Sequence, residues 1–281
     1  MIDVTTRAWL PREGLDRLIA LLREDGRKVV GPTVQDAAVV YDEIGSGADL
    51  PTGVTDEQAP GRYRISKDTN GSKDTNGSKD TNGSSAKSFD YASSPTSWKS
   101  FTFPSKVPIA RATRDGDELA YEAITHDAPR MAFVGVRACD LAALAIHDDV
   151  LTGGPYIDED YADRRGKAFI VAVECAVPSE TCFCSSMGTG PEVTQGYDIA
   201  LTELDDGYVM RTASEAGKKL AARLELEAAS PLQQHEAAGV GVAARTVMAQ
   251  GLGVNTDGLK ERLMANLESE GWDRVAERCL A

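Results

Sequence analysis

Two stretches decide the fold: MAFVGVRACDLAALAIHDDVL (131–151) and AFIVAVECAVPSETCFCSSMGTGPEV (168–193). Each opens with a nearly unbroken apolar run, at 131–136 and 168–174, of the length expected for a fully buried strand. After a short turn, the first run leads into a helix predicted over 141–151. The second run leads into an irregular segment rich in Gly, Pro and Cys. Buried strands interleaved with helices indicate an α/β architecture.

Further segments on both sides extend this pattern. Residues 12–25 are predicted to form an amphipathic helix, because their leucine and isoleucine residues follow helical spacing. Trp98, Phe101 and Phe103 supply large apolar side chains that are predicted to pack in the core. The other predicted elements are strands at 28–32, 37–44, 63–65, 197–204 and 208–212, with mostly helix from 213 to 279. The sequence predicts an α/β or α+β fold, a mixed sheet with flanking helices and cysteine loops at the carboxyl ends of two strands.

Charge and composition limit the class of protein. The chain has 281 residues and a net charge of −14, which argues against nucleic acid as a partner, because a phosphate backbone requires a basic surface. No apolar run approaches the roughly 20 residues of a membrane-spanning helix. The first residues lack the apolar core of a secretory signal. We therefore expect a cytoplasmic protein without a membrane span.

Residues 45–96 interrupt the pattern with a segment rich in Gly, Ser, Thr, Asp and Asn. Within it the unit SKDTNG occurs three times in succession, from Ser66 to Gly83. The unit has no apolar side chain to bury, so it predicts a loosely structured polar insertion without a function of its own. The predicted organisation is one α/β domain made of residues 1–44 and 97–281, with 45–96 inserted into it.

Four of the five cysteines lie close together in the sequence, at Cys139, Cys175, Cys182 and Cys184. Cys139 follows the first predicted strand, and Cys175 follows the second. If these strands are neighbours in one sheet, both thiols emerge at the same edge, where open α/β sheets hold ligands. The helix predicted after Cys139 favours a thiolate at that position, and Asp140 is a suitable N-cap for it.

Four thiols at one sheet edge suit three kinds of site. Soft thiolate ligands bind either a [4Fe–4S] cluster or a tetrahedral zinc ion. The third possibility is redox chemistry of the thiols themselves at Cys182 and Cys184. The glycines and prolines of the cysteine segment make it irregular, so we expect backbone N–H groups to point toward sulfur, as they do at iron–sulfur clusters.

No other motif in the sequence indicates a site. His147 lies on the predicted helix 141–151, two turns from Cys139, where a surface or core position is expected, and His126 and His235 sit in polar stretches without a visible partner. The GTGP run (188–191) lacks the Lys and Ser/Thr of a phosphate-binding loop. We therefore predict no nucleotide site in this chain.

The sequence resembles a known family in four stretches. They are SWKSFTFP (97–104), GVRACDLAAL (135–144), DEDYADRRGKAFIVAVECAVPSETCFCSSMGTGPEV (158–193) and GYDIALTEL (196–204). The family comprises the beta subunits of soluble sulfhydrogenase-type nickel–iron hydrogenases, together with the related electron-carrier subunits of anaerobic sulfite reductases. The likeness covers most of the chain outside the KDTNGS insertion.

The resemblance implies a non-catalytic electron carrier. Such proteins relay electrons from a flavin- and NAD(P)-binding reductase subunit to a catalytic hydrogenase or sulfite reductase subunit, or in the reverse direction. The resemblance favours a [4Fe–4S] cluster held by Cys139, Cys175, Cys182 and Cys184. Family members also carry a C-terminal ferredoxin-like domain with two further clusters. Cys279 resembles its first ligand, so we expect that domain after Ala281, where this sequence no longer contains it.

Two other functions stay open on the residues alone. A structural zinc-binding assembly subunit would use the same four ligands, would be colourless, and would lose its fold on chelation. A thiol oxidoreductase would use Cys182 and Cys184 without a metal. This last function is the least favoured, because a Cys-x-Cys pair forms a strained disulfide.

Overall fold

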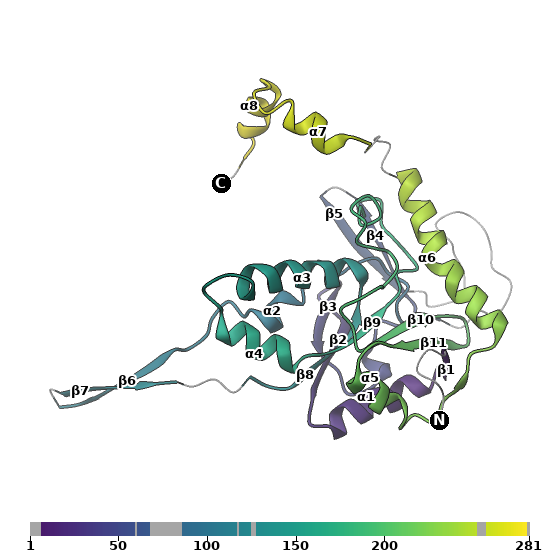
Figure 1. Ribbon diagram of the computed structural model, residues 1–281, viewed down its shortest axis with the longest axis horizontal. Helices are drawn as coiled ribbons and strands as arrows, with labels where there is room; N and C mark the ends of the chain where they lie inside the picture. The colour runs from purple at the N-terminus through teal and green to yellow at the C-terminus, as the bar shows by residue number, and fades with distance from the viewer. Residues whose placement is uncertain are drawn as a thin grey trace.

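The computed structural model describes residues 7–59, 61–67, 86–116, 118–124, 128–251 and 257–279. At its centre lies a mixed sheet of eight strands in the order β12-β1-β11-β10-β9-β8-β2-β3 (Figure 1). Its strands are β1 (Ala8–Pro11), β2 (Lys28–Gln35), β3 (Ala38–Glu43), β8 (Met131–Val136), β9 (Phe169–Val173), β10 (Ile199–Glu203), β11 (Gly207–Thr212) and β12 (Glu227–Ala228). The helices are α1 (Gly14–Glu24), α2 (Lys99–Thr102), α3 (Ala138–Thr152), α4 (Glu159–Lys167), α5 (Glu215–Ala221), α6 (Pro231–Gly251), α7 (Leu259–Met264) and α8 (Gly271–Ala276). This architecture confirms the predicted fold class.

The four central strands β10, β9, β8 and β2 run parallel, and antiparallel strands complete the sheet on both sides. β8 and β9 are buried along their whole length, as parallel strands covered on both faces must be. Alternate side chains of a strand point to opposite faces. In β9, Val171 and Val173 enter one hydrophobic core, and Ile170 and Ala172 enter the other.

Helices cover both faces of the sheet (Figure 1). The amphipathic helix α1 packs on one face through residues such as Leu18 and Ile19, and α5 joins it through Leu220. On the other face α3 packs through Leu141 and Leu144, with α4 beside it. Each fully buried Leu or Ile side chain contributes about 1.5–3 kcal/mol, so the two layers together hold the central strands in place.

A bulge at Gly135 redirects β8 immediately before the cysteine loop. The register with β9 shifts between Val134 and Val136, and Gly135 has a φ of +93°, which side chains rarely adopt. A Cβ at this position would lie 2.9 Å from Phe89 Cε1. Because of the bulge, Phe133 and Val136 both enter the core beneath α3.

The described part of residues 45–96 contributes to the folded body. It contains a 3-10 helix, η1 (Gly47–Asp49), and a hairpin of β4 (Val54–Ala59) and β5 (Arg62–Lys67), which includes the strand predicted at 63–65. Leu50, Phe89 and Tyr91 are buried in the hydrophobic cores. The SKDTNG repeat lies almost entirely outside the described residues, and the division of the chain at 45–96 stays a prediction.

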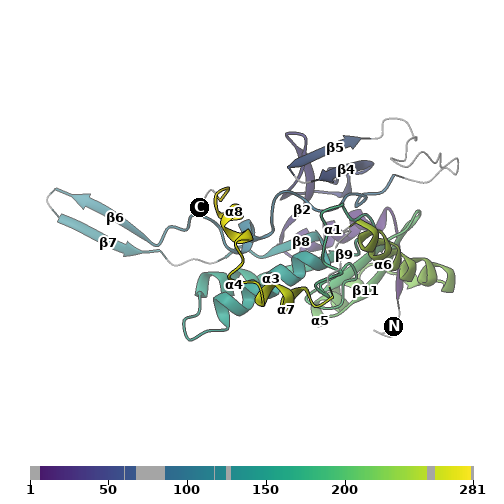
Figure 2. The same ribbon diagram turned by 90° about the horizontal axis from the view of Figure 1, so that it is seen from above.

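Two extensions project from this body. The hairpin of β6 (Ala110–Asp115) and β7 (Glu118–Ala123) extends away from the sheet, and α7 and α8 follow beyond α6 (Figure 1, Figure 2). No helix within the described ranges is long and apolar enough to cross a membrane. Helix was predicted in the second extension, whereas the β6–β7 hairpin, β1 and α4 were not predicted.

The first turn of α3 differs from the prediction. The helix begins at Ala138 instead of 141, so Cys139 lies inside its first turn. Arg137 occupies the N-cap position that was predicted for Asp140. Asp140 nevertheless helps to cap the helix, because its carboxylate accepts a hydrogen bond of 3.1 Å from the Arg137 backbone N–H.

The aromatic segment at 97–104 is only partly buried. Trp98 is buried, stacks on Tyr41 with ring centroids 3.9 Å apart, and packs against Phe133. Phe101 is half-buried against the same core. Phe103 is 39% exposed, so the prediction that it packs in the core is wrong, and its ring lies instead near the Lys99 ammonium group.

Replacement of Gly135 tests the bulge. Gly135→Ala is expected to lower the free energy of unfolding by about 1–3 kcal/mol, because the alanine would be strained at positive φ and would crowd Phe89. The matched control is Gly166→Ala in α4, where nothing lies within 4 Å of the added Cβ and alanine is the better helix former. Urea denaturation compares the two variants. Equal stabilities would contradict the assigned role of Gly135.

Candidate metal centre

The structure brings the starts of both cysteine segments to one edge of the sheet. β8 and β9 are parallel neighbours, with Ala132 opposite Phe169 and Val134 opposite Val171. Their carboxyl ends therefore lie side by side, as expected, and lead to Cys139 and Cys175. Cys175 is buried, Cys139 is exposed in the first turn of α3, and the other two cysteines are half-buried on the loop that follows β9.

Cys139, Cys175 and Cys184 each lie close enough to other cysteines of the set for those thiols to affect their pKa. Although Cys139 keeps an exposed surface, the protein atoms packed around its sulfur raise the pKa of the thiol to about 12, with further contributions from Asp140 and from the nearby thiol of Cys184. Burial also raises the pKa of Cys175, and Cys182 adds to the effect while the positive charge of Arg137 opposes it. The pKa of Cys184 is raised by burial, by Cys175 and by Cys182. The four predicted site residues thus share one neighbourhood.

These shifts correct one expectation. The helix N-terminus was predicted to favour a thiolate at Cys139, but partial desolvation of the sulfur and the carboxylate of Asp140 outweigh the helix dipole and raise the pKa. Without a metal, Cys139, Cys175 and Cys184 are thiols at neutral pH. Metal binding must therefore displace protons from them.

The four cysteines lie near one another, but their side chains are not arranged as metal ligands. Within the described residues, no three His, Cys, Asp or Glu side chains are arranged to hold a metal ion. The assignment of Cys139, Cys175, Cys182 and Cys184 as ligands therefore stays a prediction. Cys279 is exposed after α8. His147 lies on α3, His235 is exposed on α6, and His126 falls outside the described residues.

Backbone N–H groups of the cysteine loop point at sulfur, as predicted, and those of Ser185 and Cys184 oppose the rise that burial causes in the pKa of the Cys184 thiol. The Ser179 backbone N–H points at Cys182 Sγ, 3.3 Å away. Several other N–H groups of the loop are used in its own turns, including those of Met187, which donates to Phe183 O, and Thr189, which donates to Cys184 O. Internal turns shape this loop, and the N–H groups of Ser179, Cys184 and Ser185 remain as donors that can adjust the properties of a bound metal group.

Two features of the site fit a bulky sulfur-ligated group. Gly190 borders Cys184, and a Cβ on it would lie 3.1 Å from both Cys184 Sγ and Ala138 Cβ. Any larger residue would press on the thiol and on the start of α3. In addition, Nη1 of the buried Arg137 has no hydrogen-bond partner. Soft thiol donors, a glycine backbone packed closely beside one of them and a buried cation without an ion-pair partner among the described residues together suit an anionic metal–thiolate group.

Glu174 closes the base of the cysteine loop. It directly precedes Cys175 and is 8% exposed. Its carboxylate accepts a hydrogen bond of 2.8 Å from the Val193 N–H and pairs with Arg211 of β11. Arg211 also donates to Val193 O at 3.0 Å. Both ends of the loop that carries Cys182 and Cys184 are therefore tied to the sheet by one partly buried ion pair.

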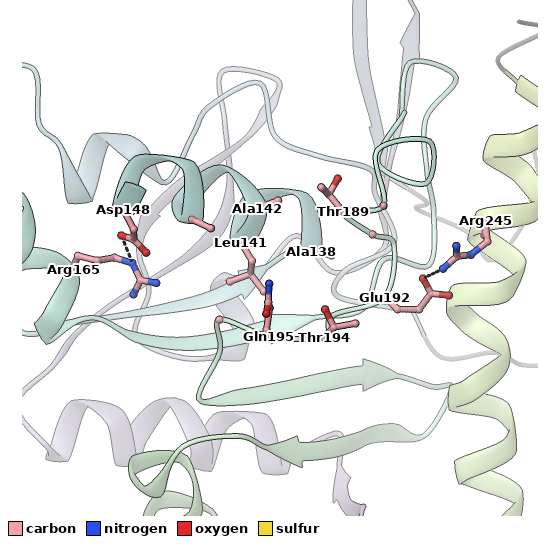
Figure 3. Close-up of a pocket in the computed structure, with 14 residues that line it drawn as sticks. Ala138, Leu141, Ala142, Asp148, Arg165, Thr189, Glu192, Thr194, Gln195 and Arg245 are labelled. Carbon is pink, nitrogen blue, oxygen red and sulfur yellow. Dashed lines mark hydrogen bonds and ion pairs between the residues drawn. The ribbon is translucent and has the colours of Figure 1, made fainter. Parts of the chain in front are cut away.

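A cavity of about 430 Å³ opens beside the site (Figure 3). α3 contributes Ala138 and Leu141 to its wall, and the loop from Gly188 to Gly196 forms the opposite side. Ion pairs flank it at each end, between Arg165 and Asp148 and between Arg245 and Glu192. No sequence motif indicated this cavity, because its lining comes from four separate segments: α3, α4, the loop from Gly188 to Gly196, and α6.

One curated protein gives an independent comparison. Over 151 residues the chain is 31% identical to a protein named sulfhydrogenase 2 subunit beta, from Pyrococcus furiosus. The match covers 54% of this chain and 44% of that relative, so the matched part spans less than half of the relative's length. No family model matches the chain, and no solved structure matches it. The chain is thus similar to a hydrogenase beta subunit, as its sequence motifs predicted.

Loss of the buried charge at Glu174 is expected to loosen the loop. Glu174→Gln should lower the free energy of unfolding by about 1.5–3 kcal/mol, the range for hydrogen bonds to a charged group, because Arg211 keeps contact with solvent. The control is Glu215→Gln, which breaks an exposed pair with Lys218 and should change stability little. Thermal unfolding of both variants gives the comparison. A Glu174→Gln chain as stable as the control would show that the pair does not hold the loop.

Proposed function

We propose that this chain is an iron–sulfur electron-transfer subunit of a cytoplasmic hydrogenase or sulfite reductase complex. The observation that carries the proposal is the shared neighbourhood of Cys139, Cys175, Cys182 and Cys184 at the carboxyl ends of β8 and β9. The similarity to a protein named as a sulfhydrogenase subunit supports a redox role over a purely structural zinc site.

In this proposal the four cysteines hold one [4Fe–4S] cluster, which supplies one-electron transfer when bound. The Ser179 N–H donates toward Cys182 Sγ, and the Gly190 backbone packs closely beside Cys184. The chain needs no nucleophile or proton-transfer residue of its own. The chemistry on hydrogen or sulfite belongs to a catalytic partner subunit, and a flavin- and NAD(P)-binding reductase subunit is the other partner.

Exposed apolar side chains mark where a partner would approach. Phe183 and Met187 are 62% and 65% exposed and flank the half-buried Cys184. An electron carrier must bring its cofactor close to its partner, so this loop is the proposed contact region. The free state of the described cysteines agrees with the reducing conditions of the cytoplasm.

Metal analysis of the full chain tests the proposal. After anaerobic purification we expect about four irons and four acid-labile sulfides per chain, as a [4Fe–4S] cluster requires. Cys175→Ser and Cys184→Ser should each lose most of this iron, because each removes one thiolate ligand. Cys279→Ser is the matched control, since Cys279 is an exposed cysteine after α8, and it should retain the iron.

Two results would contradict the proposal. About one zinc per chain without sulfide would indicate a structural metal site. Iron that is lost equally from Cys279→Ser and Cys184→Ser would show that the four clustered thiols are not the ligand set.

A further inference from the structure

We infer that Arg137 is the built-in counter-cation of the anionic metal group held by the four cysteines, and that it favours the reduced state of that group. The inference rests on the proposed function for the identity of the group. Beyond the proposed function, Arg137 receives a charge-balancing role although it is not a ligand.

The burial of Arg137 is nearly complete. Its exposure is 2%, and its guanidinium lies over the Tyr91 ring, 4.9 Å from the centroid. Nη2 donates to Phe89 O at 3.0 Å and to Tyr91 O at 2.5 Å. Nη1 is equally enclosed but has no hydrogen-bond partner. The side chain is therefore held firmly by two carbonyl groups while one of its donors stays unused.

No carboxylate within the described part of the chain forms an ion pair with this cation. The ion pairs found among the described residues do not include Arg137. Asp140 is close in sequence, but its carboxylate accepts from the Arg137 backbone N–H at 3.1 Å and from Trp98 Nε1 at 3.3 Å. Burial raises the pKa of Asp90 and Asp140, and the charge of Arg137 acts to lower the pKa of both, but neither carboxylate forms an ion pair with the guanidinium. A further anion close to Nη1 would therefore add to the stabilisation of this buried charge.

The cysteines provide that anion when they bind a metal. Arg137 follows β8 and Cys175 follows the neighbouring strand β9, and the positive charge of Arg137 opposes the desolvation that raises the pKa of both Cys175 and Cys139. Four thiolates carry four negative charges, and a cluster core or a zinc ion offsets only part of them. Reduction of a cluster by one electron adds a further negative charge. A fixed neighbouring cation must stabilise this more negative state, which raises the reduction potential.

Arg27 offers a matched comparison. It is half-buried and lies over Phe169, 5.1 Å from the ring centroid, and Nη1 donates to Met131 O at 3.2 Å and Lys167 O at 2.8 Å. It thus bridges backbone carbonyls and stacks on an aromatic ring, as Arg137 does. It lies at the start of β8 and β9, the edge of the sheet opposite to the cysteines. Arg27 therefore holds backbone carbonyl groups together as Arg137 does, but its charge lies far from the cysteines.

The test uses the full chain with Arg137→Met, Arg137→Lys and Arg27→Met. Dithionite is the electron donor in a redox titration of the reconstituted cluster, and thermal unfolding is measured with and without metal. Arg137→Met should shift the reduction potential to more negative values, and metal loading should raise its melting temperature by less than half of the wild-type gain. Arg137→Lys keeps the positive charge, so its reduction potential and its gain in melting temperature on metal loading should both be close to the wild-type values. Arg27→Met should lower the melting temperature equally in both states and leave the potential unchanged.

Several outcomes would overturn the inference. One is an unchanged potential in Arg137→Met, and another is a shift of equal size in Arg137→Lys, which would indicate a steric role. If Arg137→Met does not fold, Arg137→Gln takes its place, because glutamine can still donate to one of the two carbonyls. A wild-type chain that binds zinc instead of a cluster would overturn the proposed function alone, and the stability gain on zinc loading would still decide the role of Arg137. A wild-type chain that binds neither would contradict both.

Discussion

The side-by-side parallel pairing of β8 and β9 is the constraint on which the site depends. Both strands are buried along their length, so neither can shift its register without moving apolar side chains out of a core. Their carboxyl ends deliver Arg137 and Cys139 from one strand and Glu174 and Cys175 from the other. The chemistry of the site is thus positioned by hydrophobic packing that contains none of the chemical groups itself.

A chain of buried polar contacts connects this edge to the rest of the molecule. Glu203 at the end of β10 accepts from the backbone N–H groups of Ser88 and Phe89 at 2.8 and 2.9 Å. The same segment then offers the carbonyl groups of Phe89 and Tyr91 to Arg137. Burial raises the pKa of Glu203, while these two N–H groups and Arg12 lower it. The position of the guanidinium beside the cysteines therefore depends on residues far away in the sequence.

The contrast between predictable and unpredictable features follows from this arrangement. The apolar runs at 131–136 and 168–174 indicated β8 and β9, because a fully buried strand must be apolar on both faces. The placement of Cys139 and Cys175 at one edge followed from those strands. The start of α3 was harder to predict from the sequence. Arg137 replaces Asp140 at the N-cap, and the Asp140 carboxylate caps the helix from within its first turn.

Other features had no local signal at all. Phe89 and Tyr91 lie in a segment whose composition predicted a polar insertion, and only the tertiary structure shows them buried. The contact between Arg137 and Phe89 joins residues 48 positions apart, which no periodicity reveals. The pKa of Cys139 also reversed its expected direction, because partial desolvation of the sulfur and the Asp140 charge outweigh the helix dipole. Sequence patterns identified the ligand candidates, and the structure was needed to find their electrostatic surroundings.

The central claim is that the four clustered cysteines hold one redox-active iron–sulfur cluster. Electron paramagnetic resonance of the anaerobically purified full chain, before and after reduction with dithionite, tests it most directly. The account predicts a new signal on reduction that corresponds to about one unpaired electron per chain and disappears on reoxidation. A folded chain that stays silent after reduction, with zinc bound in place of iron, would contradict it.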